Sequence, residues 1–469
     1  MTLVKVLVRP DYPIAPGIEK LTPLDQFTVR MYMPLSCLFQ IDSPTLRPTI
    51  LRNLQSGLAN TIEDVNFLAG TIVRESPEND YIQLKYDEQG AGVWFYHQTL
   101  EEINYKDLVD SHFLFSDEFA DTFVPKPHVH LEPCPVLTAQ ATFINGGLVL
   151  TISLHHSLVD AQGAATVIEL WSKHTVAESE GRILPDNERP SRDCMDSYSL
   201  SWGRTQIPRS DFHPYFPQPI RGYEKSQEKV MQAALAGRRE ELSTVVKLSH
   251  WSLSADAINE LKRVAAPKSV DLPTVTENSI LSAFIWHRVS FARQLSMHQV
   301  SSSSLFTTVN LRRRMDPPLP AGFLRNAVVL GKAAASTPQL EAPLSDAIYP
   351  LARSIGEGID WWTSERIWDF TSSIESWSKT SAQAFPSMDQ DLFVTIPSRL
   401  GDLIWKSFWG SEVGQVKELR SAAIGYFDGI ALVLPTARGG QEIMLWTTKD
   451  ALQRLQADSE WIRWAEFLG

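Results

Sequence analysis

Hydrophobic and polar positions follow two periods along the chain, and their order predicts strands alternating with helices. Two early segments predict strands over part of their length. They are VKVLVRP near the start and LTPLDQFTVRMYMPLSCLFQI after it. A helix is expected around residues 47–62, where the apolar side chains of one face are Ile50, Leu51, Leu54, Leu58 and Ile62. Residues 135–154 predict a hairpin, in which PVLTAQATFI and LVLTISL are joined by NGG. The period after Gly163 is helical again, with a face formed by Ala164, Val167, Ile168 and Trp171.

The second half of the chain repeats this mixture. VVKLSHWSL predicts a strand, and Ser254 is placed to cap the helix ADAINELKRVA that follows it. Further on, the pattern predicts a long helix in ENSILSAFIWHRVSFARQL, a strand in LFTTVNL, a strand pair in FDGIALVLPTARGGQEIMLWTT and a closing helix in KDALQRLQA. The proline-rich stretch from about 181 to 222 keeps no period, which is typical of a linker or a functional loop. We therefore predict two mixed α/β domains, 1–180 and 236–469, joined by a crossover at 181–235.

Composition places the chain among ordinary globular proteins of two or three domains. It has 469 residues, of which 43% are hydrophobic and 21% charged. The formal net charge of −12 argues against general binding to nucleic acid or to an anionic membrane. Cys37, Cys134 and Cys194 are too widely spaced for a disulfide framework or a zinc motif, which favours a reducing compartment. Without a signal-peptide pattern or a membrane-spanning run, a soluble cytoplasmic protein is expected.

One stretch, TISLHHSLVDAQG at 151–163, carries candidate chemistry. His156 follows a predicted strand directly, and histidine is the side chain best suited to general-base catalysis near neutral pH. Asp160 could hydrogen-bond the imidazole or pair with a distant cation, and Gly163 would permit a tight turn. The alternatives are a purely structural histidine and a metal site built from His155, His156 and Asp160. No second ligand cluster supports a metal, and no G-x-S-x-G segment supports a serine hydrolase.

HHSLVDAQG resembles the HHxxxDxxG signature of the BAHD family of CoA-dependent acyltransferases, which the condensation domains of peptide synthetases share in part. Further segments resemble those of the family in the same order and cover nearly the whole chain. They are LTPLDQ, NFLAGTI, SILSAFIWHRVSFAR, VNLRRRMDPPLPAGFLRNAV and GYFDGIALVLP. The mix is most similar to fungal members of the trichothecene acetyltransferase kind.

The resemblance implies two similar domains of the chloramphenicol-acetyltransferase type with a tunnel between them. It implies acyl-CoA as co-substrate, no bound cofactor or metal, and a monomer. An acyl group, acetyl first among the candidates, would pass to a hydroxyl or amine of a hydrophobic secondary metabolite. In this reading His156 is the general base and His155 its structural neighbour. Asp160 would point away from the base and form a buried pair with Arg312.

The chain departs from the family at its second signature, DFGWG, where it has KSFWG at 406–410. Trp409 and Gly410 match, whereas Lys406 stands at the family's aspartate. In the family this segment lies near the CoA entrance, so the change puts the local tunnel geometry in question. The resemblance leaves Trp409 or Ser398 as the donor to the oxyanion, a role that acyl transfer requires.

For several other residues the sequence allows both a functional and a purely structural interpretation. Arg313 and Arg314 could be a solvated charge run or could bind CoA phosphates, and for Lys262, Arg263 and Lys268 a solvated helix face is favoured. WDFTSSIESWSK at 368–379 could contact the acceptor or form an amphipathic helix. Two rival functions also stay open. One is a condensation-type enzyme that uses carrier-bound acyl groups, and the other is a repurposed relative that binds a metabolite or promotes a cyclisation.

Overall fold

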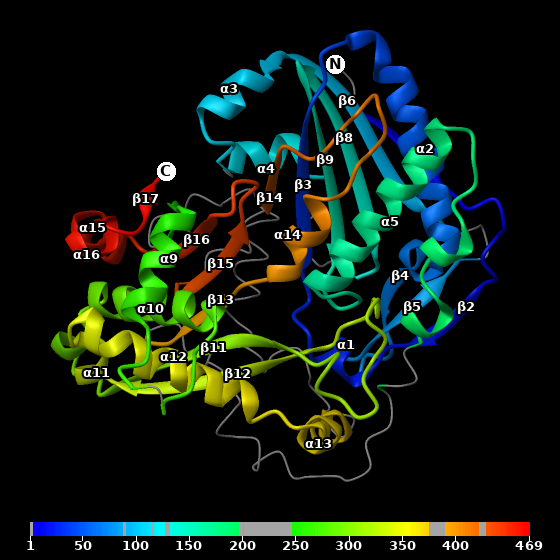
Figure 1. Cartoon of the computed structure of the whole chain (residues 1–469). Helices are drawn as coiled ribbons and strands as arrows, with labels where there is room; N and C mark the ends of the chain where they lie inside the picture. The colour runs from blue at the N-terminus through cyan, green and yellow to red at the C-terminus, as the bar shows by residue number, and fades with distance from the viewer. Residues whose placement is uncertain are drawn as a thin grey trace.

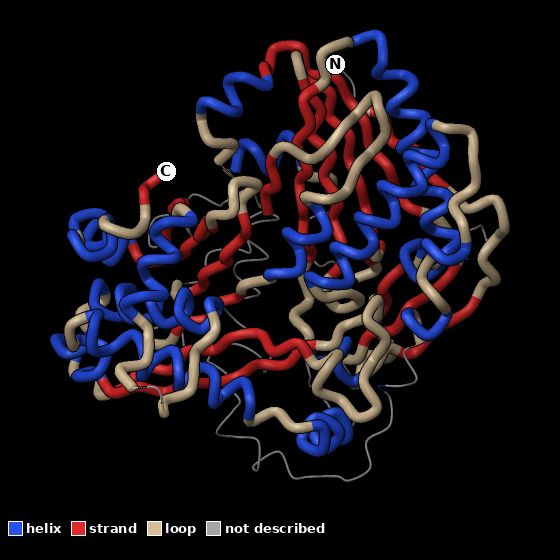
Figure 2. Tube along the Cα trace, in the orientation of Figure 1, coloured by secondary structure: helices blue, strands red, loops and turns tan. Residues whose placement is uncertain are grey.

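Three β-sheets with helices packed against them make up the part of the chain that the structure describes (Figure 1). The computed structural model describes residues 3–87, 91–114, 117–126, 132–196, 200, 246–269, 271–374, 390–421 and 428–469. The two larger sheets lie side by side, and helices cover each of them (Figure 2). This is the mixed α/β, two-domain architecture that the sequence predicts.

The first sheet has six strands and contains the predicted hairpin. Its order is β1-β6-β8-β9-β3-β14, with the bounds Val4–Val8, Val93–Asn104, Leu137–Asn145, Gly147–His155, Tyr32–Gln40 and Glu418–Ser421. All nine residues of β9 are buried, as expected of a central strand with both faces covered. Its last residue, His155, pairs with Tyr32 of β3.

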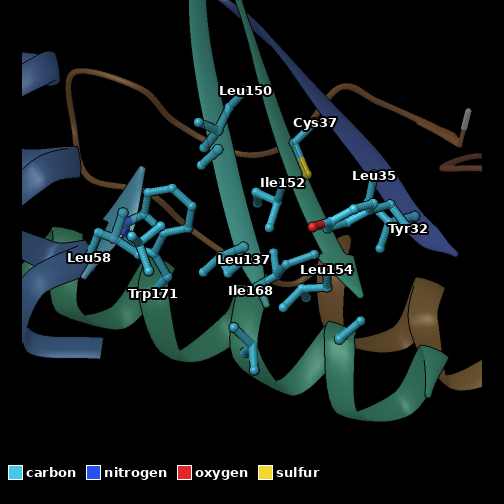
Figure 3. Packing of buried hydrophobic residues seen from close by; sticks show 14 of the residues in the cluster. Tyr32, Leu35, Cys37, Leu58, Leu137, Leu150, Ile152, Leu154, Ile168 and Trp171 are labelled. Carbon is cyan, nitrogen blue, oxygen red and sulfur yellow. The ribbon is translucent and has the colours of Figure 1, made fainter. Parts of the chain in front are cut away.

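Two long helices, α2 (Arg47–Asp64) and α5 (Ala161–Ser179), pack against each other and against this sheet. Figure 3 shows Ile168 and Trp171 of α5 facing Ile152 and Leu154 of β9. The indole of Trp171 is fully buried and donates a hydrogen bond of 2.9 Å to the carbonyl of Leu54 in α2. The apolar faces read from the sequence are therefore the ones that build this core.

The second sheet has seven strands, in the order β12-β11-β13-β15-β16-β10-β17. Their bounds are Val328–Ser336, Ser302–Asn310, Leu392–Thr395, Ile430–Pro435, Gln441–Thr448, Val246–Leu253 and Glu466–Phe467. Its helices are α9 (Ala255–Val264), α10 (Glu277–Ala292), α11 (Thr337–Glu341), α12 (Leu344–Asp360), α15 (Lys449–Ala457) and α16 (Ser459–Ile462). The predicted cap of α9 is present, because the Ser254 side chain accepts a hydrogen bond from the Ala257 amide.

A small four-stranded sheet lies below the first one, in the order β2-β5-β4-β7. Its strands are Gly17–Lys20, Ile82–Tyr86, Thr71–Arg74 and Cys134–Pro135. Beside it runs the short helix α1 (Pro23–Phe27), whose residues are all buried. The Gln26 side chain exchanges hydrogen bonds of 2.6 and 3.0 Å with the backbone of Ile82, which ties α1 to β5.

The chain crosses between the two halves more often than a simple division at 181–235 suggests. Strand β14 comes from the second half, yet it pairs with β3 of the first sheet. The preceding helix α14 (Ser398–Ile404) buries Leu400 and Ile404 in the first core. The predicted division places all of these residues in the second domain, whereas β14 pairs with a strand of the first sheet. Residues 201–245, most of the predicted crossover, lie outside the described residues.

Candidate active site

The corner between β9 and α5 presents His156 at the end of the central strand. The backbone amide of His155 still donates to the Val136 carbonyl of the sheet, and the amide of His156 donates to Met31 at 2.8 Å. The chain then turns, and α5 begins at Ala161 with Asp160 as its N-cap. Residues of both flanking elements are buried, so the packing around the corner holds His156 in place.

His155 has the surroundings of a structural residue. It is fully buried, and its ring meets the Tyr32 ring edge-on with 5.0 Å between centroids. Its Nδ1 accepts a hydrogen bond of 3.2 Å from the amide of Ser157. These contacts fix the turn and leave His155 with no access to a substrate.

His156 differs from its neighbour because the residue is partly exposed. Its Nδ1 is buried and has no hydrogen-bond partner in the part of the chain described, which leaves Nε2 as the accessible nitrogen. Burial lowers the pKa of His156 from its usual 6.5, while nearby groups, among them the Asp160 charge and the Asn326 side chain, oppose that shift. The imidazole is therefore neutral near pH 7 and able to accept a proton.

Asp160 is fully engaged by partners other than His156. Its Oδ2 and Oδ1 accept from Nη1 and Nη2 of Arg312 at 2.8 and 2.9 Å, a bidentate pair. The amides of Gly163 and Ala327 donate to the same carboxylate at 2.9 and 3.0 Å. Both members of the pair are buried. The geometry agrees with the predicted buried pair and leaves Asp160 unable to orient the imidazole.

The segment between β11 and β12, residues 311–327, carries Arg312 to the motif. Arg312 also donates to the carbonyls of Phe323 and Arg325, which folds the segment around its guanidinium. Gly163 allows the close approach, since a Cβ there would lie 2.0 Å from the Leu324 carbonyl oxygen. Position 163 thus requires glycine because the two halves of the chain pack closely there.

Two further residues at the site are ones that the sequence did not single out. Asn326 is fully buried, and its Nδ2 donates to the His156 carbonyl at 2.8 Å and to Oδ1 of Asp25 at 2.9 Å. Asp25 also accepts from the amide of Thr22 at 3.1 Å. Burial raises the pKa of Asp25 to about 6, although Arg325 and these hydrogen bonds lower it. Both residues lie in segments that resemble the family, and this resemblance is the sequence feature that could have pointed to them.

The second predicted signature lies far from His156. Trp409 packs between Phe39 and Trp171, with centroids 5.8 and 5.6 Å away. Phe39 stands seven residues along β3 from Tyr32, the partner of His155, which is about 23 Å at ~3.3 Å per residue. Trp409 is therefore wrongly placed to donate to an oxyanion at His156, and it serves the first core instead.

Gly410 lies at the same remote end. Its φ is +98°, and a Cβ there would lie 3.3 Å from Oγ of Ser179, the last residue of α5. Asp160 caps the opposite end of this helix, about 28 Å away at ~1.5 Å per residue. Gly410 therefore forms a turn and cannot contact the reacting atoms. The Ser398 side chain lies outside the described residues, so its proposed role stays a prediction.

The remaining basic candidates lie on the surface. Lys262 pairs with Glu277 at 2.9 Å and Lys268 with Asp346 at 3.2 Å, as a solvated helix face would. Arg314 pairs with Asp360 at 3.0 Å, while Arg313 and Arg263 are exposed. Of the segment 368–379, residues up to 374 belong to helix α13 (Ser364–Ile374), and the rest lies outside the described residues. Phe370 and Ile374 are buried, which favours the amphipathic helix there.

The described residues offer neither a metal cluster nor a membrane-spanning helix. They contain no group of three or more His, Cys, Asp or Glu side chains that could hold a metal ion. None of their helices combines the length and the apolar character needed to cross a bilayer. The three cysteines form no disulfide in the structure, and all are buried.

Comparison with known proteins supplies an independent line of argument. A model described as the Transferase family matches residues 2–460. The acyltransferase easC of Emericella nidulans is 28% identical over 480 residues, covering 98% of this chain and 97% of that protein. The trichothecene 3-O-acetyltransferase TRI101 of Fusarium sporotrichioides is 21% identical, covering 94% of both.

Solved structures agree on the fold. The crystal structure of F. sporotrichioides TRI101 complexed with coenzyme A and T-2 superimposes with a TM-score of 0.80 at 17% identity, covering 97% of this chain and all of that one. Vinorine synthase gives a TM-score of 0.66 at 16% identity, covering 99% of both chains. A condensation domain of the calcium-dependent antibiotic synthetase gives 0.52 at 11% identity, covering 95% of both.

Proposed function

The chain belongs to the Transferase family as a CoA-dependent acyltransferase of the BAHD type, and from that premise we propose that His156 is its general base. The acceptor would be a hydroxyl, or an amine, of a hydrophobic secondary metabolite, and the donor acetyl-CoA. As in the family, the substrates would meet at His156 in a tunnel between the two domains. A monomeric, cytoplasmic enzyme remains part of this proposal.

One observation carries the assignment of the base. Of the two adjacent histidines, only His156 is partly exposed, and it keeps a free Nε2. Asp160, the other ionisable residue of the stretch HSLVD at 156–160, has both oxygens bound by Arg312 and by backbone amides. His156 is thus the one group of this motif that is able to exchange a proton with a substrate.

The proposed reaction proceeds in two balanced steps. Nε2 of His156 removes the proton of the acceptor hydroxyl while the hydroxyl oxygen attacks the thioester carbonyl carbon. This attack gives a tetrahedral intermediate. The intermediate collapses, the C–S bond breaks, and the imidazolium returns its proton to the departing CoA thiolate. No acyl-enzyme forms, so the rate depends on both substrates being bound together. A general base of this kind contributes about 10²- to 10⁴-fold.

The choice of substrates rests on the relatives. F. sporotrichioides TRI101 is a trichothecene 3-O-acetyltransferase, and its crystal structure is complexed with coenzyme A and T-2. The crystal structure of F. graminearum TRI101 is complexed with coenzyme A and deoxynivalenol. The O-acetyltransferases ptmV of Penicillium ochrochloron and anaAT of Neosartorya fischeri are also similar to this chain. A bulky apolar alcohol and acetyl-CoA are therefore the first pair to test.

Thiol release from acetyl-CoA, measured with a panel of hydrophobic alcohols, tests the proposal. We expect acceptor-dependent release from the wild type and a loss of at least 10²-fold in His156→Ala. His298→Ala is the matched control, because His298 is an exposed histidine of the second domain and should be dispensable.

Other outcomes separate the rival functions. Acyl transfer only from phosphopantetheinyl-protein donors would favour the condensation-type enzyme. Full activity of His156→Ala would favour a repurposed relative and would contradict the assignment of the base.

A further inference from the structure

The second domain carries a cavity of about 460 Å³ where α10, α12 and α16 meet. These helices lie at the left of Figure 1, on the outer side of the second sheet. Ala431 and Val433 of β15 face them in the second core. The alternate residues Ile430 and Leu432 belong to the first core, so the sheet separates the cavity from His156. A cavity of this size suits a small organic ligand.

Aromatic and aliphatic side chains form one wall of the cavity. They are those of Phe291, Leu344 and Trp464. Phe291 is 46% exposed, whereas Leu344 and Trp464 are buried. Arg463 also lines the cavity, but it stacks on the Trp464 ring at 4.6 Å and pairs with Glu260 at 2.7 Å, so its charge is already matched. The exposed Phe291 ring is left free to pack against the flat body of an aromatic ligand.

Arg288 brings a positive charge with one free edge to the cavity. Its side chain is 7% exposed, and Nε and Nη2 both donate to Oδ2 of Asp458. Nη1 has no hydrogen-bond partner among the described residues, so the edge that Asp458 leaves open is the one available to a ligand. The Leu344 and Ser345 amides at the start of the 17-residue helix α12 also lack partners there. A planar guanidinium and a helix N-terminus both favour a carboxylate.

Two carboxylates line the same cavity. Oε1 of Glu341 accepts from the Ser296 amide at 3.2 Å, and Oε1 of Glu460 accepts from the Trp464 indole at 3.1 Å. Neither Oε2 has a partner in the described part of the chain. These two acids disfavour a ligand that is only anionic, but they would pair with an ammonium group. A ligand that matches the cavity therefore carries a carboxylate, an ammonium group and a ring.

We propose that this cavity binds an aromatic α-amino acid. The carboxylate accepts from Nη1 of Arg288 and from the first amides of α12, the ammonium group pairs with Glu341 and Glu460, and the ring packs against Phe291. The site is separate from the proposed acyl transfer and does not depend on it. Because the ligand would contact three helices of the folded protein at once, its binding should raise Tm.

Calorimetric titration of the full chain with L-phenylalanine tests the proposal. We expect saturable binding at one site per chain. Three analogues each remove one recognised group: 3-phenylpropanoate lacks the ammonium group, phenethylamine lacks the carboxylate, and L-alanine lacks the ring. Each should bind at least about 10-fold more weakly, because a charged hydrogen bond or a buried ring contributes that much. No binding of L-phenylalanine, L-tyrosine or L-tryptophan would overturn the proposal, as would an analogue that binds as tightly as L-phenylalanine.

Substitutions locate the binding at the cavity. Phe291→Ala should weaken L-phenylalanine at least about 10-fold. Phe467→Ala is the matched control, because Phe467 is a phenylalanine of the same domain with 44% exposure and does not line the cavity. It should bind as the wild type does. Equal affinities of the two variants would contradict the location.

Two further variants assign the charges, with the analogues as internal controls. Arg288→Lys keeps a cation for Asp458 but removes the planar edge, so it should weaken L-phenylalanine and leave phenethylamine unchanged. Glu341→Gln keeps the oxygen that the Ser296 amide uses, and it should weaken L-phenylalanine and leave 3-phenylpropanoate unchanged. A loss that is equal for L-phenylalanine and both analogues would contradict these contacts. Glu341→Gln and Phe291→Ala keep the test open where Arg288→Lys does not fold.

A last titration separates this site from the tunnel. We expect His156→Ala to bind L-phenylalanine as the wild type does, and excess acetyl-CoA to leave the affinity unchanged. Displacement of the amino acid by acetyl-CoA would overturn the proposal, because the ligand would then occupy the proposed path of the donor. Failure to acylate any alcohol would count against the proposed function alone.

Discussion

At the scale of single residues, the site divides its ionisable groups between catalysis and structure by where each can make contacts. His156 keeps an accessible nitrogen, Asp160 is bound to Arg312, and Asp25 is buried behind Asn326. The three groups lie close together, and under the proposed function only the imidazole would exchange protons with a substrate. Their differing surroundings lead to separate predictions for pH and stability.

The activity should persist below the pH at which a free histidine becomes protonated. Burial lowers the pKa of His156, so the neutral, basic form extends to lower pH than the usual value of 6.5. We expect the acidic limb of kcat/KM, which reports the free enzyme, to have its midpoint below pH 6.5. A midpoint above pH 6.5 would mean that nearby hydrogen-bond acceptors raise the pKa of His156 by more than burial lowers it.

The Asp160–Arg312 pair should contribute to stability as well as to activity. Replacing one partner leaves the other as an unpaired buried charge, which costs roughly 3–5 kcal/mol. We expect Asp160→Asn and Arg312→Met each to lower the free energy of unfolding by about that amount, measured by urea denaturation. The double variant should lose less than the sum of the two. An Asp160→Asn protein with unchanged melting would contradict the account.

Asp25 should make the protein less stable as the pH rises. Its pKa is about 6 in the folded state against 3.8 when unfolded, so the folded state binds the extra proton between those values. Stability from this group is full below pH 3.8 and is lost as pH rises through 6, by roughly 3 kcal/mol. The Tm of Asp25→Asn relative to the wild type should therefore increase between pH 4.5 and 7. A difference that does not change with pH would contradict this.

At the scale of elements, the helices with a strong apolar period and the hairpin could be predicted from the sequence. The predicted faces of α2 and α5 pack into the first core, because burial on one side repeats every three or four residues and leaves a local signal. Helix α10 is instead buried almost all round. β14 could not be predicted, since ELRS is four residues long and its partner β3 lies in the other half of the chain.

The site shows the same limit. His156 and Asp160 share one short motif, and the family resemblance was enough to pair Asp160 with Arg312. Asp25 and Asn326 are 301 residues apart, and no period or spacing relates them. Trp409 and Gly410 matched a signature, but only the register of β3 with β9 shows that they belong to the far end of the domain.

The first turn of α5 should not tolerate a side chain at Gly163. A Cβ there would lie 2.0 Å from the Leu324 carbonyl, which would push the 311–327 segment off the motif. We expect Gly163→Ala to lower Tm and to weaken activity more than stability alone explains. Gly356→Ala in α12 is the matched control, because no heavy atom lies within 4 Å, and it should stabilise by about 0.5–1 kcal/mol. Equal behaviour of the two variants would contradict the packing argument.

At the scale of the whole molecule, the two halves are interlocked. β14 completes the first sheet from the second half, and Arg312 reaches from the second half to the motif of the first. We expect calorimetry to show one unfolding transition in which the calorimetric and van't Hoff enthalpies agree. Two resolved transitions would show that the halves unfold independently.

The return of β14 to the first sheet also has a consequence for synthesis on the ribosome. The nascent chain emerges from the N-terminus, but the free edge of β3 has no partner until residues 418–421 appear, late in a chain of 469. An uncovered strand edge invites pairing with other chains. Translation therefore exposes this edge for most of its duration, and the yield of native enzyme in a foreign host should depend on chaperones that shield it.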